Sequence, residues 1–264
     1  MIALITPTGC RKDQFNICQQ LMKKQTYTGE VVWIIVDDFE PRTTDLVTED
    51  FRPNWTIIKE YPQPFWQLGY NTQGRNISVG INALDRYKSE EIEGIFIIED
   101  DDYYKPEYLD EMVKRLPGYL LIGETNTIYY NVAFRRYALN ANKAHTSLFQ
   151  IAFKPELIPY LRKIYTEKFI DFVFFDVVRR AGLNDKINLF FANYLAVGMK
   201  GMPGRSGIGA GHSRAFSMNV DSGMNYLNQL IGTADAQLYS KFYLGANNRD
   251  NNMPQQRIFS RKGI

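Results

Sequence analysis

The stretch Gly94-Ile95-Phe96-Ile97-Ile98-Glu99-Asp100-Asp101-Asp102 is the most informative part of the sequence. Its apolar residues are mostly bulky or β-branched, which predicts a buried strand. Four carboxylates follow directly, at the carboxyl end of the strand, where open α/β sheets bind their ligands. Buried adjacent carboxylates repel one another, and a divalent cation with a preference for oxygen ligands would relieve that repulsion. The alternative is a solvated acidic turn before a helix.

Strands and helices alternate on both sides of this stretch. Apolar runs predict strands at 2–5, 31–36 and 55–58, and helical spacing of apolar residues predicts helices over 12–24, 76–87 and 106–115. This alternation favours a mostly parallel sheet with covering helices. Further along, we expect strands at 120–122, 127–134, 147–153 and 187–197, the second and third of them antiparallel to each other, and helices over 155–165, 169–181 and 219–231.

A second acidic pair, Asp37-Asp38, ends the predicted strand at 31–36. Right-handed crossovers would bring the ends of both acidic strands to one edge of the sheet. Two acidic clusters at one crevice are harder to explain as solvated surface than either cluster alone. The sequence therefore favours a ligand site at this edge.

The bulk composition is that of an ordinary globular protein. The 264 residues are 45% hydrophobic and 23% charged, enough for one large α/β domain, and the net charge of +2 gives no general attraction to nucleic acid. Cys10 and Cys18 lack the spacing of a zinc site or a disulfide framework, so we expect free thiols and a cytoplasmic location. The first seven residues do not resemble a signal peptide, and no apolar run is long enough to span a bilayer.

The order of several short motifs resembles that of the GT-A glycosyltransferases, especially the family 2 type. The matches span about residues 2 to 200, and Ile170 stands where that family usually has Glu. The matching segments are Ile5-Thr6-Pro7-Thr8 with Arg11, Gln25-Thr26-Tyr27, Ile34-Ile35-Val36-Asp37-Asp38, Gly74-Arg75-Asn76, Ile97 to Asp102 with Tyr104 and Pro106 (the DxD region), and Asp171 to Gly182.

The resemblance implies a fold and an activity. The expected fold is a GT-A-type (Rossmann-like) α/β domain, with a mostly parallel sheet, flanking helices and a small antiparallel part. Residues 1–200 would form the nucleotide-sugar-binding and catalytic domain, and residues 201–264 a Gly-rich loop and a helical extension that complete it. The expected activity is the metal-dependent, hexosyltransferase-type transfer of a sugar from a nucleotide-diphospho-sugar, with UDP as the expected nucleotide, to an acceptor hydroxyl.

The resemblance also implies roles for individual residues. Asp171 would be the general base of an inverting transfer, Asp100 would face the ribose, and Glu99 would be structural. Asp176 is expected to pair with Arg179 or Arg180. The residues implied in nucleotide-sugar binding are Thr6, Pro7, Thr8, Arg11, Asp37, Asp38, Arg75, Asp100 and Arg205. The implied ligands of Mn²⁺ or Mg²⁺ are Asp101, Asp102 and His212, the last of which could instead bind the diphosphate.

Two other functions remain open at this point. A nucleotidyltransferase of related fold would want a Gly-rich, basic loop after the first strand, and Thr8-Gly9-Cys10-Arg11-Lys12 matches that poorly. A non-catalytic nucleotide-binding module would leave Asp171 with a merely structural role. For the transferase, the acceptor could be a saccharide, a lipid-linked sugar or a modified base in nucleic acid.

Overall fold

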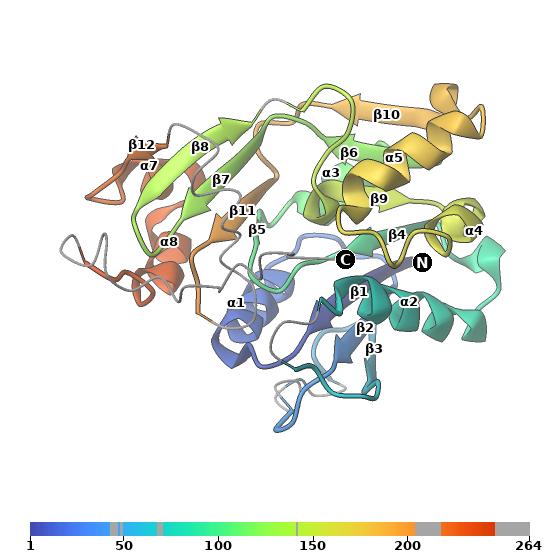
Figure 1. Cartoon of the computed structure of the whole chain (residues 1–264), viewed down its shortest axis with the longest axis horizontal. Helices are drawn as coiled ribbons and strands as arrows, with labels where there is room; N and C mark the ends of the chain where they lie inside the picture. The colour runs from blue at the N-terminus through green and yellow to red at the C-terminus, as the bar shows by residue number, and fades with distance from the viewer. Residues whose placement is uncertain (43–46, 48–49, 68–70, 141, 204–217, 246–264) are drawn as a thin grey trace, which may run out of the picture.

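A seven-stranded sheet runs through the computed structural model, which describes residues 1–42, 47, 50–67, 71–140, 142–203 and 218–245 (Figure 1). The strand order is β10-β6-β9-β4-β1-β2-β3. β9 is antiparallel to β4 and β6, and the other neighbouring strands are parallel. The strands are β1 (Ile2–Thr8), β2 (Val31–Asp37), β3 (Trp55–Glu60), β4 (Gly94–Ile97), β6 (Leu121–Glu124), β9 (Ile151–Phe153) and β10 (Ile187–Phe190).

The chain changes direction across this sheet next to β1. It runs from β1 to β2 and β3 on one side, and then crosses to β4 on the other side of β1. In the parallel register Thr8 lies opposite Asp37, and Ile5 lies opposite Ile97. The carboxyl ends of β1, β2 and β4 therefore meet at one edge, as the sequence predicted for the two acidic segments. This is the topological switch point at which open α/β sheets bind ligands.

Both faces of the central strands β1, β2 and β4 are buried, which explains why these strands are apolar without alternation. Ile2 and Leu4 pack in one cluster with helix α1 (Lys12–Lys23). Ala3 and Ile5 point the other way and pack in a second cluster, with helices α2 (Gln73–Ala83) and α5 (Ile170–Arg180). In Figure 1, α2 and α5 lie in front of the strands of this sheet.

A second, smaller sheet supplies the predicted antiparallel part. Its order is β12-β8-β7-β11-β5, in which β7 and β11 form the parallel pair. Helices α7 (Asn225–Ile231) and α8 (Thr233–Ser240) lie at its far end (Figure 1) and pack in the same cluster as α1. The strands are β5 (Tyr103–Tyr104), β7 (Thr127–Asn131), β8 (Arg136–Asn140), β11 (Ala196–Lys200) and β12 (Asn219–Val220). Two short helices are α3 (Tyr108–Val113), which follows β5, and α4 (Ile158–Leu161), which precedes α5.

Three of the expected elements differ from the structure. The run 187–197 is not one strand but β10 and part of β11, separated by the positive φ angles of Asn193 (56°) and Tyr194 (62°), so it enters both sheets. β7 and β9 belong to different sheets, and β7 pairs with β8 instead. The helix expected over 219–231 begins only at Asn225, because β12 precedes it and the Asp221 carboxylate accepts backbone N–H groups of the first turn.

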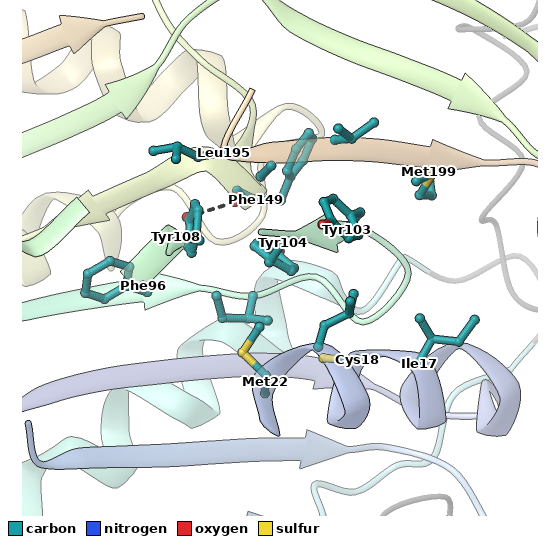
Figure 2. Packing of buried hydrophobic residues seen from close by; sticks show 14 of the residues in the cluster. Ile17, Cys18, Met22, Phe96, Tyr103, Tyr104, Tyr108, Phe149, Leu195 and Met199 are labelled. Carbon is teal, nitrogen blue, oxygen red and sulfur yellow. Dashed lines mark hydrogen bonds between the residues drawn. The ribbon is translucent and has the colours of Figure 1, made fainter. Parts of the chain in front are cut away.

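The two sheets are joined by buried contacts directly beneath the acidic segment. Figure 2 shows Cys18 and Met22 of α1 facing Phe96 and the tyrosines that follow the acids. The Tyr108 hydroxyl donates a hydrogen bond to the carbonyl of Phe149, 3.1 Å away. Glu124, at the end of β6, accepts the backbone N–H of Leu195 at 2.8 Å. The acidic segment thus sits on a packed core that fixes one sheet against the other.

The close approach of α2 to β1 gives a test of this arrangement. A Cβ atom added to Gly80 would lie 2.5 Å from Cγ2 of the buried Ile5. We expect Gly80→Val to lower the free energy of unfolding by about 1–3 kcal/mol, because the core is overpacked. Asn82→Val puts the same side chain on an exposed position of α2 and should change the value by less than about 0.5 kcal/mol. Equal midpoints for the two variants in urea denaturation would contradict the packing described.

Candidate functional site

The four acids form the turn that links β4 of the large sheet to β5 of the small one. Asp100, Asp101 and Asp102 are 2%, 7% and 0% exposed, and Glu99 is partly buried. The turn is closed by the backbone N–H of Glu99, which donates to the Tyr104 hydroxyl at 2.8 Å. The solvated acidic turn considered from the sequence is therefore wrong, because the aspartates are inside the protein.

Two cations from distant segments neutralise part of this charge. Arg11, at the start of α1, has its Nε 3.2 Å from Oδ1 of Asp100, and its Nη2 contacts the carboxylate of Asp101. Lys200, the last residue of β11, has its Nζ 3.3 Å from Oδ1 of Asp102. Two cations face four carboxylates, so the protein's own positive charges do not balance the cluster when all four acids are ionised.

The pKa values of the acids shift in different directions along the turn, because burial and neighbouring charges act on each acid to a different extent. Burial raises the pKa of Glu99, and Asp101 adds to this, while Lys200 opposes it. Burial likewise raises the pKa of Asp102 well above its usual value, against the attraction of Lys200. For Asp101, burial is outweighed by Arg11 and Lys200, so its pKa is lowered. Glu99 and Asp102 are consequently the acids whose charge is least compensated by the protein itself.

A divalent cation fits this donor set. One carboxylate oxygen from each of Glu99, Asp101 and Asp102 lies within 4.8 Å of the others. Oδ2 of Asp102 is buried and receives no hydrogen bond from the described residues. Oxygen donors with a surplus of negative charge suit Mg²⁺ or Mn²⁺. The sequence analysis assigned metal binding to Asp101 and Asp102 but gave Glu99 a structural role, and the geometry brings Glu99 into the same cluster.

Some of the predicted nucleotide-binding residues are connected to this cluster by hydrogen bonds. The Thr8 hydroxyl donates to Oδ2 of Asp100 at 2.6 Å. Asp38 is buried, and its Oδ2 accepts from the Thr72 hydroxyl at 2.6 Å and pairs with Nη2 of Arg75 at 2.7 Å. Since the backbone N–H of Asp38 donates to the Thr8 carbonyl at 3.3 Å, the two acidic strand ends are physically connected.

Other predicted residues have different surroundings. The Thr6 hydroxyl is buried and accepts a hydrogen bond from Nε1 of Trp33 at 2.9 Å, and Pro7 is also buried. Asp37 is buried too, and its Oδ1 accepts the backbone N–H of Phe39 at 3.2 Å. Arg205 and His212 lie outside the described residues. The assignment of these residues to nucleotide or metal binding stays a prediction.

Asp171 lies in the first turn of α5. The segment before α5, which contains Tyr165, packs against the start of α2. A Cβ on Gly74 would lie 1.8 Å from the Tyr165 carbonyl, so glycine is required for this contact. At the preceding position, the Gln73 amide donates to the carboxylate of Glu99. The Asp171 carboxylate is close enough to add to the elevation of the Glu99 pKa, although burial is the largest cause. The start of α5 is thus held beside the acidic cluster.

The structure also shows the partner of Asp176 on α5, and it shows two site residues that were not predicted from the sequence. Asp176 pairs with Arg180 at 2.9 Å, which confirms the expected surface ion pair. Gln73 and Thr72 hold carboxylates of both acidic segments, and no pattern in the sequence distinguished them within their Gly-, Asn- and Gln-rich surroundings. Their position at the amino end of α2, next to the Gly74-Arg75-Asn76 match, was the available signal.

No protein-family model and no curated protein sequence matches the chain. Solved structures of S. aureus TarS are similar in fold. The crystal structure of TarS has a TM-score of 0.55 at 13% identity, with 76% of this chain and 37% of that chain covered. For TarS 1-349 in complex with UDP-GlcNAc the TM-score is 0.55 at 14% identity, with 81% and 61% covered. For TarS 1-349 in complex with UDP it is 0.54 at 15% identity, with 75% and 60% covered.

The chain spans about 37% to 61% of the length of these proteins, so the likeness concerns their shared α/β part. Identities of 13% to 15% show a common fold and no more. Together with the strand order and the switch point beside β1, they show that this chain has a GT-A-like fold, as the motif order implied. In the described part of the chain, no helix is both long and apolar enough to cross a membrane.

The raised pKa of Asp102 can be measured through the pH dependence of stability. Kept free of metal by a chelator, Asp102→Asn should lose less stability than the wild type as the pH rises, because the variant has no carboxyl group to ionise at this position. The variant removes a buried charge that burial and repulsion disfavour, and keeps an oxygen to accept the N–H of Met199 at 2.7 Å.

The sign of the pH dependence follows from the raised pKa of Asp102. The folded wild type holds this proton more tightly than the unfolded chain does, so its stability falls as the pH rises above the ordinary carboxyl range. The stability of Asp102→Asn relative to that of the wild type should therefore rise from about pH 5 to about pH 8. Asp176→Asn removes a half-exposed carboxylate and is the matched control. If the stabilities of Asp102→Asn and the wild type change equally with pH, this account of Asp102 is refuted.

Proposed function

We propose that this chain is a metal-dependent glycosyltransferase, which moves a sugar from a UDP-linked donor to an acceptor hydroxyl. The observation that carries the proposal is the buried cluster of Glu99, Asp101 and Asp102 at the switch point, with the Oδ2 atom of Asp102 lacking a donor. A fold shared with TarS, which has been crystallised with UDP and with UDP-GlcNAc, supports the choice of donor.

The acidic cluster would hold the metal ion through Glu99, Asp101 and Asp102, with His212 as a further proposed ligand. When bound, Mn²⁺ or Mg²⁺ acts as a Lewis acid that stabilises negative charge on a leaving diphosphate. Arg11 is placed to fix the carboxylates of Asp100 and Asp101, because it contacts both. This leaves Asp102 and Glu99, whose negative charge is least compensated, to contribute most to cation binding.

The nucleoside would be held along the ends of β1 and β2. Asp38 is already fixed by Thr72 and Arg75, and Asp100 by Thr8, so these carboxylates have defined orientations before a ligand arrives. Carboxylate oxygens can accept hydrogen bonds from ribose hydroxyls or a uracil N–H. A prepared set of acceptors of this kind reduces the entropy lost when a nucleotide binds.

Asp171 is the proposed general base. In an inverting transfer the acceptor oxygen attacks the anomeric carbon, the bond from that carbon to the diphosphate breaks, and Asp171 takes the proton of the acceptor hydroxyl. Its place at the start of α5, beside Glu99 and partly exposed, lets it face both the donor side and an incoming acceptor. Asp176 is engaged with Arg180 and is not a competitor for this role.

The donor half of the proposal is tested by titration calorimetry with UDP, UDP-GlcNAc and UDP-glucose, with and without Mn²⁺. We expect UDP to bind in the presence of Mn²⁺ and to lose most of its affinity when the metal is chelated. Ligand at about a hundred times its Kd should stabilise the fold by about 2.7 kcal/mol in a thermal-shift assay. Binding that is unaffected by the metal, or no binding of any of these nucleotides, would refute the proposal.

The role of Asp171 is tested by Asp171→Asn. We expect transfer, or hydrolysis of the donor by water as the simplest acceptor, to fall by about 10²–10⁴-fold, because the proton acceptor is removed. UDP affinity should be unchanged, since Asp171 is not among the proposed donor ligands. Asp176→Asn, five residues further along α5, should keep normal turnover. Near-normal turnover of Asp171→Asn would exclude it as the base, and the protein would then be better described as using another base or as a binding module.

A further inference from the structure

Lys200 has surroundings that are unusual for a lysine ammonium. Its side chain is 16% exposed, and its Nζ lies 5.8 Å from the ring centroids of both Tyr129 and Phe149. Its charged partner among the described residues is Asp102, at 3.3 Å. Burial disfavours the ammonium, yet the pKa of Lys200 is raised, since Asp102, Asp101 and Glu99 all attract it. The ammonium therefore depends on the acidic cluster for its charge balance.

The same acids are the proposed metal ligands, which creates a competition. A divalent ion on Asp102 and an ammonium 3.3 Å from the same carboxylate would repel each other strongly in this buried place. Lys200 would then need another anion within reach. A diphosphate held by the same metal provides one, because hard cations at such sites usually carry substrate phosphates and lysine is a good phosphate ligand.

We propose that Lys200 is a counter-ion that changes partner during donor binding. It holds Asp102 while the acidic cluster is free of metal, and it binds the diphosphate of the nucleotide once a divalent ion takes Asp102. This inference rests on the proposed function. It assigns to Lys200 a diphosphate-binding role, and it makes binding of metal and nucleotide cooperative, because the nucleotide relieves the repulsion that the metal creates.

A permanent structural ion pair between the two sheets is the alternative, and the contacts of Asp102 argue against it. Asp102 is also tied to β11 by the backbone N–H of Met199, which donates to Oδ1 at 2.7 Å. That bond connects β11 to the acidic turn without the lysine. The ammonium is thus not required to position Asp102, and its long side chain has the rotatable bonds needed to shift.

The test measures Mn²⁺ binding without nucleotide and UDP binding with saturating Mn²⁺, in wild type, Lys200→Met and Lys200→Arg. Removing the competing charge should tighten binding of Mn²⁺ alone by about tenfold to a hundredfold in Lys200→Met, and weaken UDP by a similar factor. Lys200→Arg keeps the charge and should restore both values toward those of the wild type. Lys241→Met, which removes an exposed lysine paired with Asp13 at 2.7 Å, is the matched control and should leave both unchanged.

The possible results separate this inference from the proposed function. Unchanged or weaker binding of Mn²⁺ alone in Lys200→Met would overturn the partner exchange and favour a structural pair, as would unchanged UDP affinity. If the wild type binds UDP with Mn²⁺ and either of these holds, the inference fails while the proposed function stands. If the wild type binds no UDP with or without Mn²⁺, both fail. Circular dichroism and the thermal unfolding temperature of each variant show whether it is folded before binding is interpreted.

Discussion

The neutralisation of a buried acidic turn is the constraint on which the rest of this structure depends. Four consecutive carboxylates are held inside the protein between a strand of the large sheet and a strand of the small one. Such a concentration of charge is costly unless opposite charges are brought to it. Arg11 and Lys200 supply them, although they are separated by most of the chain and come from different layers of the fold. The parts of the fold that supply these charges also build the site.

The packing around the turn explains how this arrangement is kept in place. The aromatic residues that follow the acids join α1 and both sheets in one buried cluster (Figure 2). Beside it, glycines at 74 and 80 let α2 approach both β1 and the segment before α5. Helix α2 then presents Thr72, Gln73 and Arg75 to the carboxylates of Asp38 and Glu99. Rigid elements on each side therefore orient the acids, which is what a metal or nucleotide site requires.

The sequence predicted the large sheet better than the small one. Apolar runs that end in acids marked β2 and β4 correctly, because both faces of these strands are buried and their ends carry the polar groups. The run 187–197 was taken as one strand, since its apolar residues show no break where Asn193 and Tyr194 turn the chain. Within the site, the sequence predicted metal binding by Asp101 and Asp102 and not by Glu99, which the turn fixed by Tyr104 brings into the same cluster.

By itself, the sequence determined that acids follow two apolar runs, and the order of its short motifs resembles that of the GT-A glycosyltransferases. These are local patterns of hydrophobicity and spacing, which a single chain reveals directly. The tertiary structure decided which charges meet. The pairing of Lys200 with Asp102, of Arg75 with Asp38 and of Gln73 with Glu99 joins residues far apart in the chain. Such contacts are set by how helices and sheets pack and leave no periodic trace in the sequence, so only the folded chain shows how far its own cations already balance the acidic cluster.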